Sequence, residues 1–295
     1  MIRPMPVVLC LALWCAWAIG AAAAEVRTVR VGIEGNSAIQ ARRVATFGGD
    51  NCPAIDTFAF VQPSRLDAEL LILCNALREG GPPVHLQLVP QPNYARSLAE
   101  ALAGRLDLPS QTIWARELDE HAQALLRSLP VIQAGEWQLG LYTTENRTDV
   151  LAVRTLEQLR GLVGVAPRSW VEDWRVLASL GLKELIDVQN NDGIFPMIQA
   201  GRADFTLYSF STEPDLGSQP SYSPSRILPI RGFKVALPAT RHFAVARVAP
   251  DAQALVEQLD SGLSRLRDRG AIARAFERSG VFDQRVADWQ LIGNN

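Results

Sequence analysis

One short phrase occurs twice in this chain and marks the same point in two similar strand–helix patterns. It reads ALAGRLDL from Ala101 to Leu108 and IQAGRADF from Ile198 to Phe205. In each copy an apolar, helix-like run ends at a glycine, which adopts the left-handed conformation that stops a helix. An arginine, one further residue and an aspartate follow, and a strand-like run then begins. The chain is therefore expected to contain two related α/β units.

The first unit alternates segments typical of strands and helices. Ser64, with Asp67 three residues later, predicts the start of one helix, and Asn93 is expected to cap another. Strands are expected at 26–33, 42–49 and 84–89, a strand and loop at 106–114, and helices at 63–81 and 90–105. This order predicts a mainly parallel sheet covered by helices.

The second unit repeats the alternation and ends in a helical tail. After a strand expected at 137–144, which follows the first unit, the second unit has strands expected at 162–166, 185–189, 203–210 and 233–247, and helices expected to begin near 156, 170 and 192. A polar stretch rich in Pro and Ser, at 211–226, reads as a surface loop. Two helices broken at Gly270 complete the chain.

Residues 1–24 have the composition of a secretory signal peptide. Arg3 precedes an apolar run at 7–19, and a glycine and four alanines follow. A positive start, a short apolar core and small residues at the end are typical of such a peptide, and the run is shorter than the roughly 20 residues of a membrane span. We expect export to the periplasm, cleavage at or just before Ala24, and no membrane span in the mature chain.

The cysteines predict one disulfide. Cys10 and Cys15 leave with the signal peptide, so Cys52 and Cys74 remain. Two cysteines in an oxidising compartment usually pair, and such a bridge stabilises a fold by about 3 kcal/mol. Two free buried thiols are the alternative. A metal site is not expected, because no histidine neighbours either cysteine.

Composition and motifs exclude several classes of protein. The chain has 295 residues, 48% of them apolar, and a formal net charge of −2, which removal of Arg3 makes one unit more negative. No block of Lys or Arg points to nucleic acid. No phosphate loop, Gly-x-Ser-x-Gly motif or His-based metal spacing occurs, so no cofactor is expected.

Several segments, taken in their order along the chain, resemble those of a known protein family. They are LAGRLDL, TIWARELDEH and LLRSLPVIQAGEWQLGLYTT in the first unit and LRGLVGVAPRSWVEDW and IQAGRADFTLYS in the second. Their order resembles the type II periplasmic solute-binding proteins, in particular the family 3, amino-acid-receptor-like branch of ABC transporter substrate-binding proteins. The resemblance covers nearly all of the mature chain. It implies two α/β lobes, two crossings at a hinge, and a ligand cleft that closes between the lobes.

The resemblance also implies lobe boundaries. The first part of lobe 1 is expected at 25–142, lobe 2 at 143–238, and a return to lobe 1 at 239–295. The two crossings are expected near 142–145 and 234–239.

In lobe 2, a candidate anion site lies where a strand end meets a helix start. Free backbone N–H groups and the positive end of the helix dipole favour an anion there. Arg168 adds a charge, Ser169 a hydroxyl and Trp170 a ring that can stack on a ligand. The alternative is that Ser169 only caps the helix.

The strand after IQAGRADF departs from the family pattern. Amino-acid receptors of this family place an aspartate just past this strand, where it pairs with the ligand ammonium. Here that position is Ser209, next to Tyr208, so both are candidate ligand contacts but the cation partner is absent. Glu213 or Asp215 of the following loop are possible substitutes, and the departure argues against a standard amino-acid receptor.

In lobe 1 the resemblance suggests four polar contacts. Thr112 and Arg116 stand near the family's carboxylate-clamping arginine, although the spacing is irregular. Asp50 lies in a loop that faces the cleft in the family. Arg96 follows an aromatic residue at a helix start, and its alternative is an exposed helix charge. Trp114 is a further candidate to stack on a ligand.

Taken with the resemblance, these features imply a monomeric periplasmic protein that binds a small, polar, carboxylate-bearing ligand and delivers it to a membrane permease complex. A binding module for a separate sensor or exported enzyme would use the same cleft. A dehydratase-like enzyme on this fold is the third alternative. Catalysis is not expected, because His85 and His121 are not near a predicted strand-end cleft, although His242 could approach the hinge.

Overall fold

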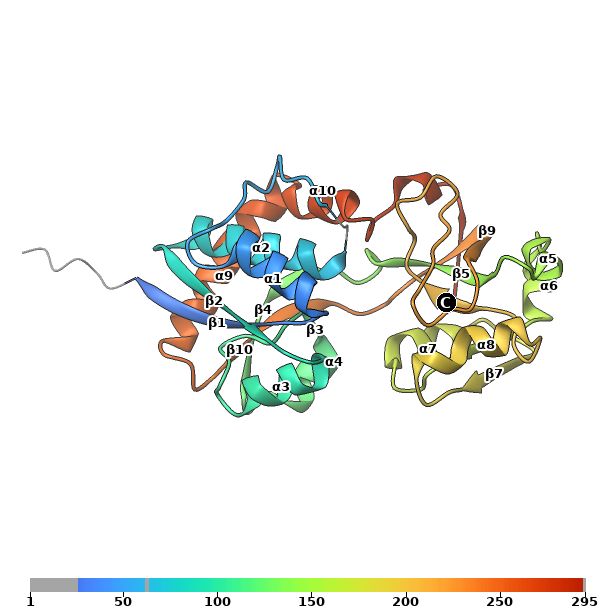
Figure 1. The fold of residues 1–295 in the computed structure, drawn as a ribbon, viewed down its shortest axis with the longest axis horizontal. Helices are drawn as coiled ribbons and strands as arrows, with labels where there is room; N and C mark the ends of the chain where they lie inside the picture. The colour runs from blue at the N-terminus through green and yellow to red at the C-terminus, as the bar shows by residue number, and fades with distance from the viewer. Residues whose placement is uncertain (1–25, 62–63, 294–295) are drawn as a thin grey trace, which may run out of the picture.

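The computed structural model describes residues 26–61 and 64–293, which form two lobes joined by extended segments (Figure 1). The predicted signal peptide, residues 1–24, lies outside the described residues. Within the described ranges, no helix is both long and apolar enough to cross a membrane.

The first lobe packs helices around two small sheets. Its elements are β1 (Arg27–Ile33), α1 (Ser37–Phe47), α2 (Arg65–Gly80), β2 (Val84–Pro90), α3 (Tyr94–Leu102), β3 (Ile113–Trp114), α4 (Ala115–Glu120), β4 (Leu125–Ile132), β10 (Arg241–Ala246), α9 (Ala252–Asp268) and α10 (Ala271–Arg278). β1 and β2 pair in parallel, while β10 lies between β3 and β4 in antiparallel register. The capped helix starts are confirmed, since the Ser64 and Asn93 side chains accept the N–H groups of Asp67 and Arg96.

The second lobe contains the longer sheet, in the order β11-β9-β5-β8, and a parallel pair, β6-β7. Its elements are β5 (Gln138–Thr144), α5 (Thr148–Leu151), α6 (Leu156–Arg160), β6 (Val163–Ala166), α7 (Val171–Ser179), β7 (Glu184–Asp187), η1 (Asn191–Gly193), α8 (Ile194–Gln199), β8 (Thr206–Tyr208), β9 (Ile227–Ala236), η2 (Gln284–Val286) and β11 (Gln290–Ile292). Each lobe has its own buried apolar core.

The repeated phrase has the same structural role in both lobes. Gly104 and Gly201 follow the ends of α3 and α8 with φ of +72° and +68°. This left-handed conformation is strained for residues with a Cβ, which explains the glycine at both stops. In each lobe the chain then turns to run beside a central strand, as a parallel bridge at Leu108 in the first lobe and at Phe205 in the second.

The aspartate of each phrase anchors that turn. Asp107 accepts the backbone N–H of Arg30 at 2.7 Å and pairs with its guanidinium. Asp204 accepts the backbone N–H of Val163 at 2.7 Å and pairs with Arg147. Each aspartate therefore satisfies a strand N–H and an arginine together, so the two units share this local device.

The disulfide prediction is confirmed, and one strand prediction is wrong. Cys52 and Cys74 form a bridge that ties the loop after α1 to α2. Of the segment 42–49, expected as a strand, residues 42–47 instead belong to helix α1, which the Asn36 side chain caps. Arg43 and Phe47 are buried while Ala45, midway between them, is exposed, a pattern that the alternating faces of a strand do not produce.

The crossings differ in part from the expected ones. β5 pairs with β8 and β9, and its Leu141 is buried in the core of the second lobe. The first crossing therefore lies at 133–137, before β5, and not near 142–145. The second lies at 237–240, between β9 and β10, and overlaps the expected segment.

The tail makes a third crossing, which corrects the expected two crossings and the assignment of all of 239–295 to lobe 1. Phe282 packs on the core of the first lobe, whereas Val286 is buried in the second. Lys234 Nζ donates to the carbonyl of Val286 at 2.6 Å, and β11 pairs in parallel with β9. The C-terminal residues thus complete the sheet of the second lobe.

Candidate ligand-binding cleft

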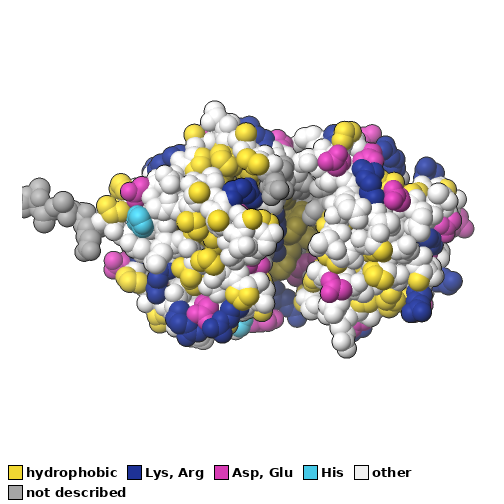
Figure 2. All heavy atoms as spheres, viewed as in Figure 1, with side chains coloured by type: hydrophobic (Ala, Val, Ile, Leu, Met, Phe, Trp, Pro, Cys, Tyr) yellow, Lys and Arg dark blue, Asp and Glu magenta, His cyan; other side chains and the backbone are white. Residues whose placement is uncertain are grey.

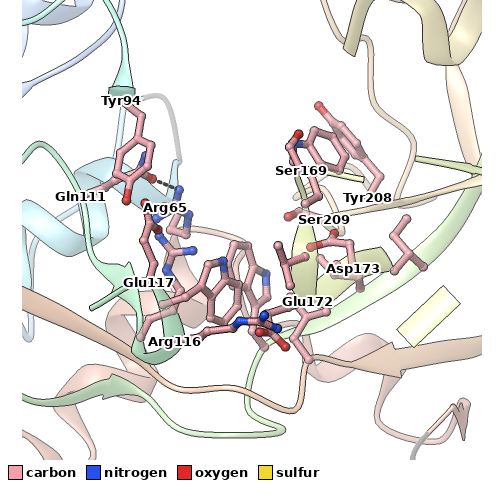
Figure 3. A pocket seen from close by; sticks show the side chains of 18 of the residues that line it. Arg65, Tyr94, Gln111, Arg116, Glu117, Ser169, Glu172, Asp173, Tyr208 and Ser209 are labelled. Carbon is pink, nitrogen blue, oxygen red and sulfur yellow. Dashed lines mark hydrogen bonds between the residues drawn. The ribbon is translucent and has the colours of Figure 1, made fainter. Parts of the chain in front are cut away.

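A cleft of about 950 Å³ lies between the lobes. Figure 2 shows the surface hollowed between the two halves of the molecule. The first lobe and the crossings contribute Arg65, Tyr94, Gln111, Trp114, Arg116, Glu117, Glu120, Trp137, Leu237 and Arg241 to the lining. The second lobe contributes Leu139, Ser169, Trp170, Val171, Glu172, Asp173, Leu207, Tyr208 and Ser209. Figure 3 shows labelled members of both walls.

Two arginines and two tryptophans form the base of the first-lobe wall. Trp114 and Trp137 stack with ring centroids 5.7 Å apart. The guanidinium carbon of Arg241 lies 4.5 Å from the Trp114 centroid, and that of Arg65 lies 5.2 Å from the Trp137 centroid. Guanidinium groups stacked on rings retain N–H donors at their edges. The base is therefore cationic and aromatic.

Thr112 holds the guanidinium of Arg241 through two hydrogen bonds. Its Nε donates to Thr112 Oγ1 at 2.9 Å, and its Nη2 donates to the Thr112 carbonyl. The side chain is buried, and burial together with the nearby charge of Arg65 lowers the pKa of Arg241 to about 9. A guanidinium with that pKa remains charged at neutral pH, so Arg241 is a partly desolvated cation that lines the cleft.

Arg65 is held by two acceptors of the first lobe. Its Nη1 donates to Glu69 at 2.6 Å, and its Nη2 donates to Gln111 (Figure 3). Glu69 lies one helical turn further along α2 and also accepts the backbone N–H of Thr112 at 2.9 Å and its hydroxyl at 2.7 Å. Arg65, Glu69, Thr112 and Arg241 therefore form one continuous network beneath the cleft.

The opposite wall carries carboxylates at the start of α7. Glu172 pairs with Arg175 at 3.0 Å, and Asp173 is half-buried beside it. Burial raises the pKa of Asp173 to about 6, although the charge of Arg241 acts in the opposite direction. The cleft thus places a cationic base in one lobe against a carboxylate in the other.

Two further polar groups at the cleft have no hydrogen-bond partner among the described residues. They are the hydroxyl of Tyr94 and the indole Nε1 of Trp137. Burial raises the pKa of Tyr94, so its hydroxyl remains protonated and able to donate. A buried donor without an acceptor costs free energy, and a ligand with acceptor atoms would remove that cost.

Five of the residues expected at the ligand do line the cleft. They are Arg116, Ser169, Trp170, Tyr208 and Ser209. Trp114, expected to stack on a ligand, also lines it but carries Arg241 on its ring. Helix α7 begins at Val171, its N-cap residue is Trp170, and no side chain caps it, so Ser169 does not take the capping role that was its alternative.

Four expected ligand contacts lie elsewhere. Asp50 is exposed and pairs with His85 near the start of β2, at 3.2 Å. Arg96 pairs with Glu100 on the surface of α3. Thr112 is fully buried and holds Arg241 instead of reaching the cleft.

Arg168, the expected anion-binding residue, is the fourth expected ligand contact that lies outside the cleft. Its backbone N–H donates to Asp187 at 2.9 Å, and its guanidinium lies over the Trp174 ring at 4.7 Å. Its side chain is 70% exposed and is absent from the cleft lining. The loop turns it outward because Asp187, at the end of the neighbouring strand β7, binds the backbone on that side.

The residues that sequence reasoning missed come from distant parts of the chain. Arg65 begins a helix, Arg241 begins β10, and Asp173 follows a helix start. Each has the sequence environment of an ordinary surface charge. One sequence signal points to Arg241. It directly precedes the apolar segment HFAVAR, which indicates that the arginine begins a buried strand. Among the described residues, no group of three or more His, Cys, Asp or Glu side chains could hold a metal ion.

Comparison with known proteins supports the fold. No family model matches the chain, and no curated protein matches it. Among solved structures, substrate-binding domain 2 of GlnP from Lactococcus lactis, in an open conformation, has a TM-score of 0.52 and 14% identity, covering 88% of this chain and 97% of its own.

A second similar structure is YtmK from Bacillus subtilis, described as a probable amino-acid ABC transporter extracellular-binding protein. It has a TM-score of 0.53 and 15% identity, covering 87% of this chain and all of its own. Both comparisons span nearly the full length of the described chain. The chain therefore has the two-lobed α/β fold seen in substrate-binding proteins of amino-acid ABC transporters, as the sequence predicts.

Proposed function

We propose that this protein captures a small carboxylate-bearing ligand by closing its two lobes, and that it delivers the ligand to an ABC-type importer. The observation that carries this proposal is the buried Arg241 at the base of the cleft, held in place by Thr112 and stacked on Trp114. Its Nη1 has no hydrogen-bond partner among the described residues, whereas its Nε and Nη2 are used.

A carboxylate is the ligand group that best matches this base. Arginine binds carboxylates through parallel N–H donors, and such charge-assisted hydrogen bonds are roughly twice as strong as neutral ones. The partial desolvation of Arg241 strengthens the attraction, because little water competes for the guanidinium. The nearby donors of Tyr94 and Trp137 can bind further oxygen atoms of the ligand.

The opposite wall favours a positive group at the other end of the ligand. Ser209 stands where amino-acid receptors of this fold have an aspartate, but Asp173 on α7 lines the same cleft. Asp215, a possible substitute in the loop, instead pairs with Arg226 at 2.6 Å. Asp173 thus supplies the missing cation partner, and a small zwitterion such as an amino acid fits the cleft, in line with the amino-acid ABC transporter named for the YtmK structure.

The chain connections allow the lobes to move against each other. Three extended segments cross between the lobes, at 133–137, at 237–240 and near 283. Trp137 ends the first crossing and Arg241 follows the second, so the ligand base lies at the hinge itself. Closure about this hinge would bring Asp173 toward the ligand and exclude water from the arginines.

Export and disulfide formation fit a periplasmic place of action, and we propose that the mature chain acts there as a monomer. Capture for a separate sensor or enzyme would use the same cleft. A transport role and a partner role differ in whether import of the ligand is lost when the protein is absent.

The test is the melting temperature of the mature protein against a panel of amino acids, dicarboxylates, aromatic acids, polyamines and sugars. A ligand at a hundredfold excess over its Kd stabilises a protein by about 2.7 kcal/mol. Amino acids or other carboxylates should raise the melting temperature of the wild type, and Arg241→Met should abolish that rise. Arg168→Ala, a control outside the cleft, should keep it. Stabilisation by uncharged sugars only would contradict the proposal.

A further inference from the structure

Glu69 is a buried carboxylate that hydrogen-bonds to Arg65 directly and to Thr112, the residue that holds Arg241. It is 2% exposed and does not line the cleft, so a ligand in the cleft does not reach it. Its two oxygens accept three hydrogen bonds, one from Arg65 and two from Thr112. Because the Thr112 hydroxyl donates to Glu69, its lone pair is left to accept Arg241 Nε.

The charges of this network do not cancel. Arg65 and Arg241 are cations and Glu69 is an anion, so the base carries one net positive charge. Arg116, the remaining arginine of the lining, is exposed and lies 3.8 Å from Glu120 at the rim. One ligand carboxylate is therefore enough to neutralise the base.

The rest of the lining would repel a second negative charge on the ligand. Glu117 lies on the first-lobe wall, and Glu172 and Asp173 lie on the second (Figure 3). Glu120 also lines the first-lobe wall. Lys or Arg side chains other than Arg65, Arg116 and Arg241 are absent from the lining formed by the described residues. An anion that enters a partly desolvated site without a cation partner loses its hydration without a compensating attraction, so its binding is weakened.

We propose that Glu69 is a positioning residue that also limits the net charge of the arginine base to one, and so restricts the cleft to ligands with a single carboxylate. This inference rests on the proposed function and specifies how many negative charges an accepted ligand carries. Glu69 acts through Arg65 and Thr112, and its removal would leave a base with two uncompensated positive charges.

The test is the Glu69→Gln variant, which keeps the shape of the side chain and removes its charge. Kd values are measured by calorimetry for two matched pairs, L-glutamine with L-glutamate and succinamate with succinate. In each pair an amide replaces one carboxylate. The wild type should prefer the monocarboxylate member, and Glu69→Gln should shift the ratio of Kd values toward the dicarboxylate by about tenfold, as expected for a unit charge roughly 12 Å away at an effective dielectric constant near 20.

Two further variants separate charge from folding. Glu79→Gln makes the same substitution on the same helix, at a residue paired with Arg269, and should leave the ratio unchanged. Arg65→Gln removes a cation from a partly exposed position and should move the ratio in the opposite direction, further against the dicarboxylate. This second variant tests the inference even if Glu69→Gln fails to fold.

The outcomes distinguish the inference from the proposed function. A wild type that binds both members equally, prefers the dicarboxylate, or binds none of the four compounds would overturn the inference. An unchanged ratio in a folded Glu69→Gln variant, or a ratio that Arg65→Gln moves toward the dicarboxylate, would also overturn it. In all these cases the proposed function still stands if other carboxylates stabilise the wild type through Arg241.

Discussion

Thr112 Oγ1 accepts a hydrogen bond of 2.9 Å from Nε of Arg241, across the antiparallel pairing of β3 with β10. The pairing places Arg241 opposite Trp114, so β3 supplies the ring and Thr112, the residue just before β3, supplies the hydroxyl that together fix the guanidinium. The orientation of the principal cation in the cleft therefore depends on a side chain that the ligand does not touch.

Replacing Thr112 by valine should weaken carboxylate binding without unfolding the protein. The valine keeps the volume of the threonine but leaves Arg241 Nε without its acceptor. A hydrogen bond to a charged group contributes about 1.5–3 kcal/mol, so Kd should rise by roughly tenfold or more. Calorimetric titration of a carboxylate that stabilises the wild type measures this change. Thr46→Val, at a hydroxyl that bonds only within α1, is the control and should bind like the wild type.

Asp173→Asn should stabilise the unliganded protein at pH 7.5 and lose that effect near pH 4. Burial raises the pKa of Asp173 to about 6 from the ordinary value of 3.8. The folded state therefore favours the protonated form, and the carboxylate destabilises the fold increasingly as pH rises from about 4 through 6. Above that range the ionised Asp173 destabilises the folded state by its full amount, and a neutral asparagine removes this destabilisation.

Thermal unfolding of both proteins at the two pH values measures this difference. Asp288→Asn, at an exposed site of the tail, is the control and should change little at either pH. An increase in melting temperature for Asp173→Asn that is the same at pH 4 and pH 7.5 would contradict the assignment of the raised pKa to this carboxyl.

The same Asp173→Asn variant should change which ligands bind. An amino acid that stabilises the wild type should lose most of its effect, because its ammonium no longer meets a carboxylate. The corresponding carboxylic acid without the amine should bind the variant at least as well as it binds the wild type. For the wild type, affinity for the amino acid should also fall as pH drops through 6, where Asp173 becomes protonated. Equal loss of both ligands would show that Asp173 does not recognise the amine.

Arg168→Ala should leave carboxylate affinity within about twofold of the wild type. The Arg168 side chain is exposed, lies over Trp174 and approaches Asp187, outside the cleft. Exposed ion pairs contribute at most about 1 kcal/mol, so stability should change little as well. A large loss of affinity in calorimetry would mean that lobe closure swings Arg168 into the cleft.

Reduction of the Cys52–Cys74 bridge should lower the free energy of unfolding by about 3 kcal/mol, the effect expected for closing a loop of this length. Denaturant unfolding with and without a reducing agent measures the difference. A double variant with serine at both positions should show the lower stability and should not respond to the reducing agent. Carboxylate binding should persist, because the bridge ties α2 to a loop away from the cleft.

Local sequence determined the elements of this protein where short-range chemistry is sufficient. The helix caps at Ser64 and Asn93 and the helix stops at Gly104 and Gly201 lie where propensity and φ preference predict them. The repeated Gly-Arg-x-Asp phrase predicted two related units because both copies use one local device. The sequence was misleading at 42–49, where β-branched residues suggested a strand, whereas the structure buries Arg43 and Phe47 and exposes Ala45 between them, as in a helix.

Only the tertiary structure decided the composition of the cleft and the path of the crossings. Arg65, Thr112, Asp173 and Arg241 meet because strands and helices far apart in the chain pack at the hinge. Desolvation and the field of neighbouring charges turn these residues from ordinary surface types into a binding site, and both effects exist only after folding. The assignment of β5 and the tail to the second lobe likewise follows from strand pairing with β9, an interaction between distant segments that no local pattern specifies.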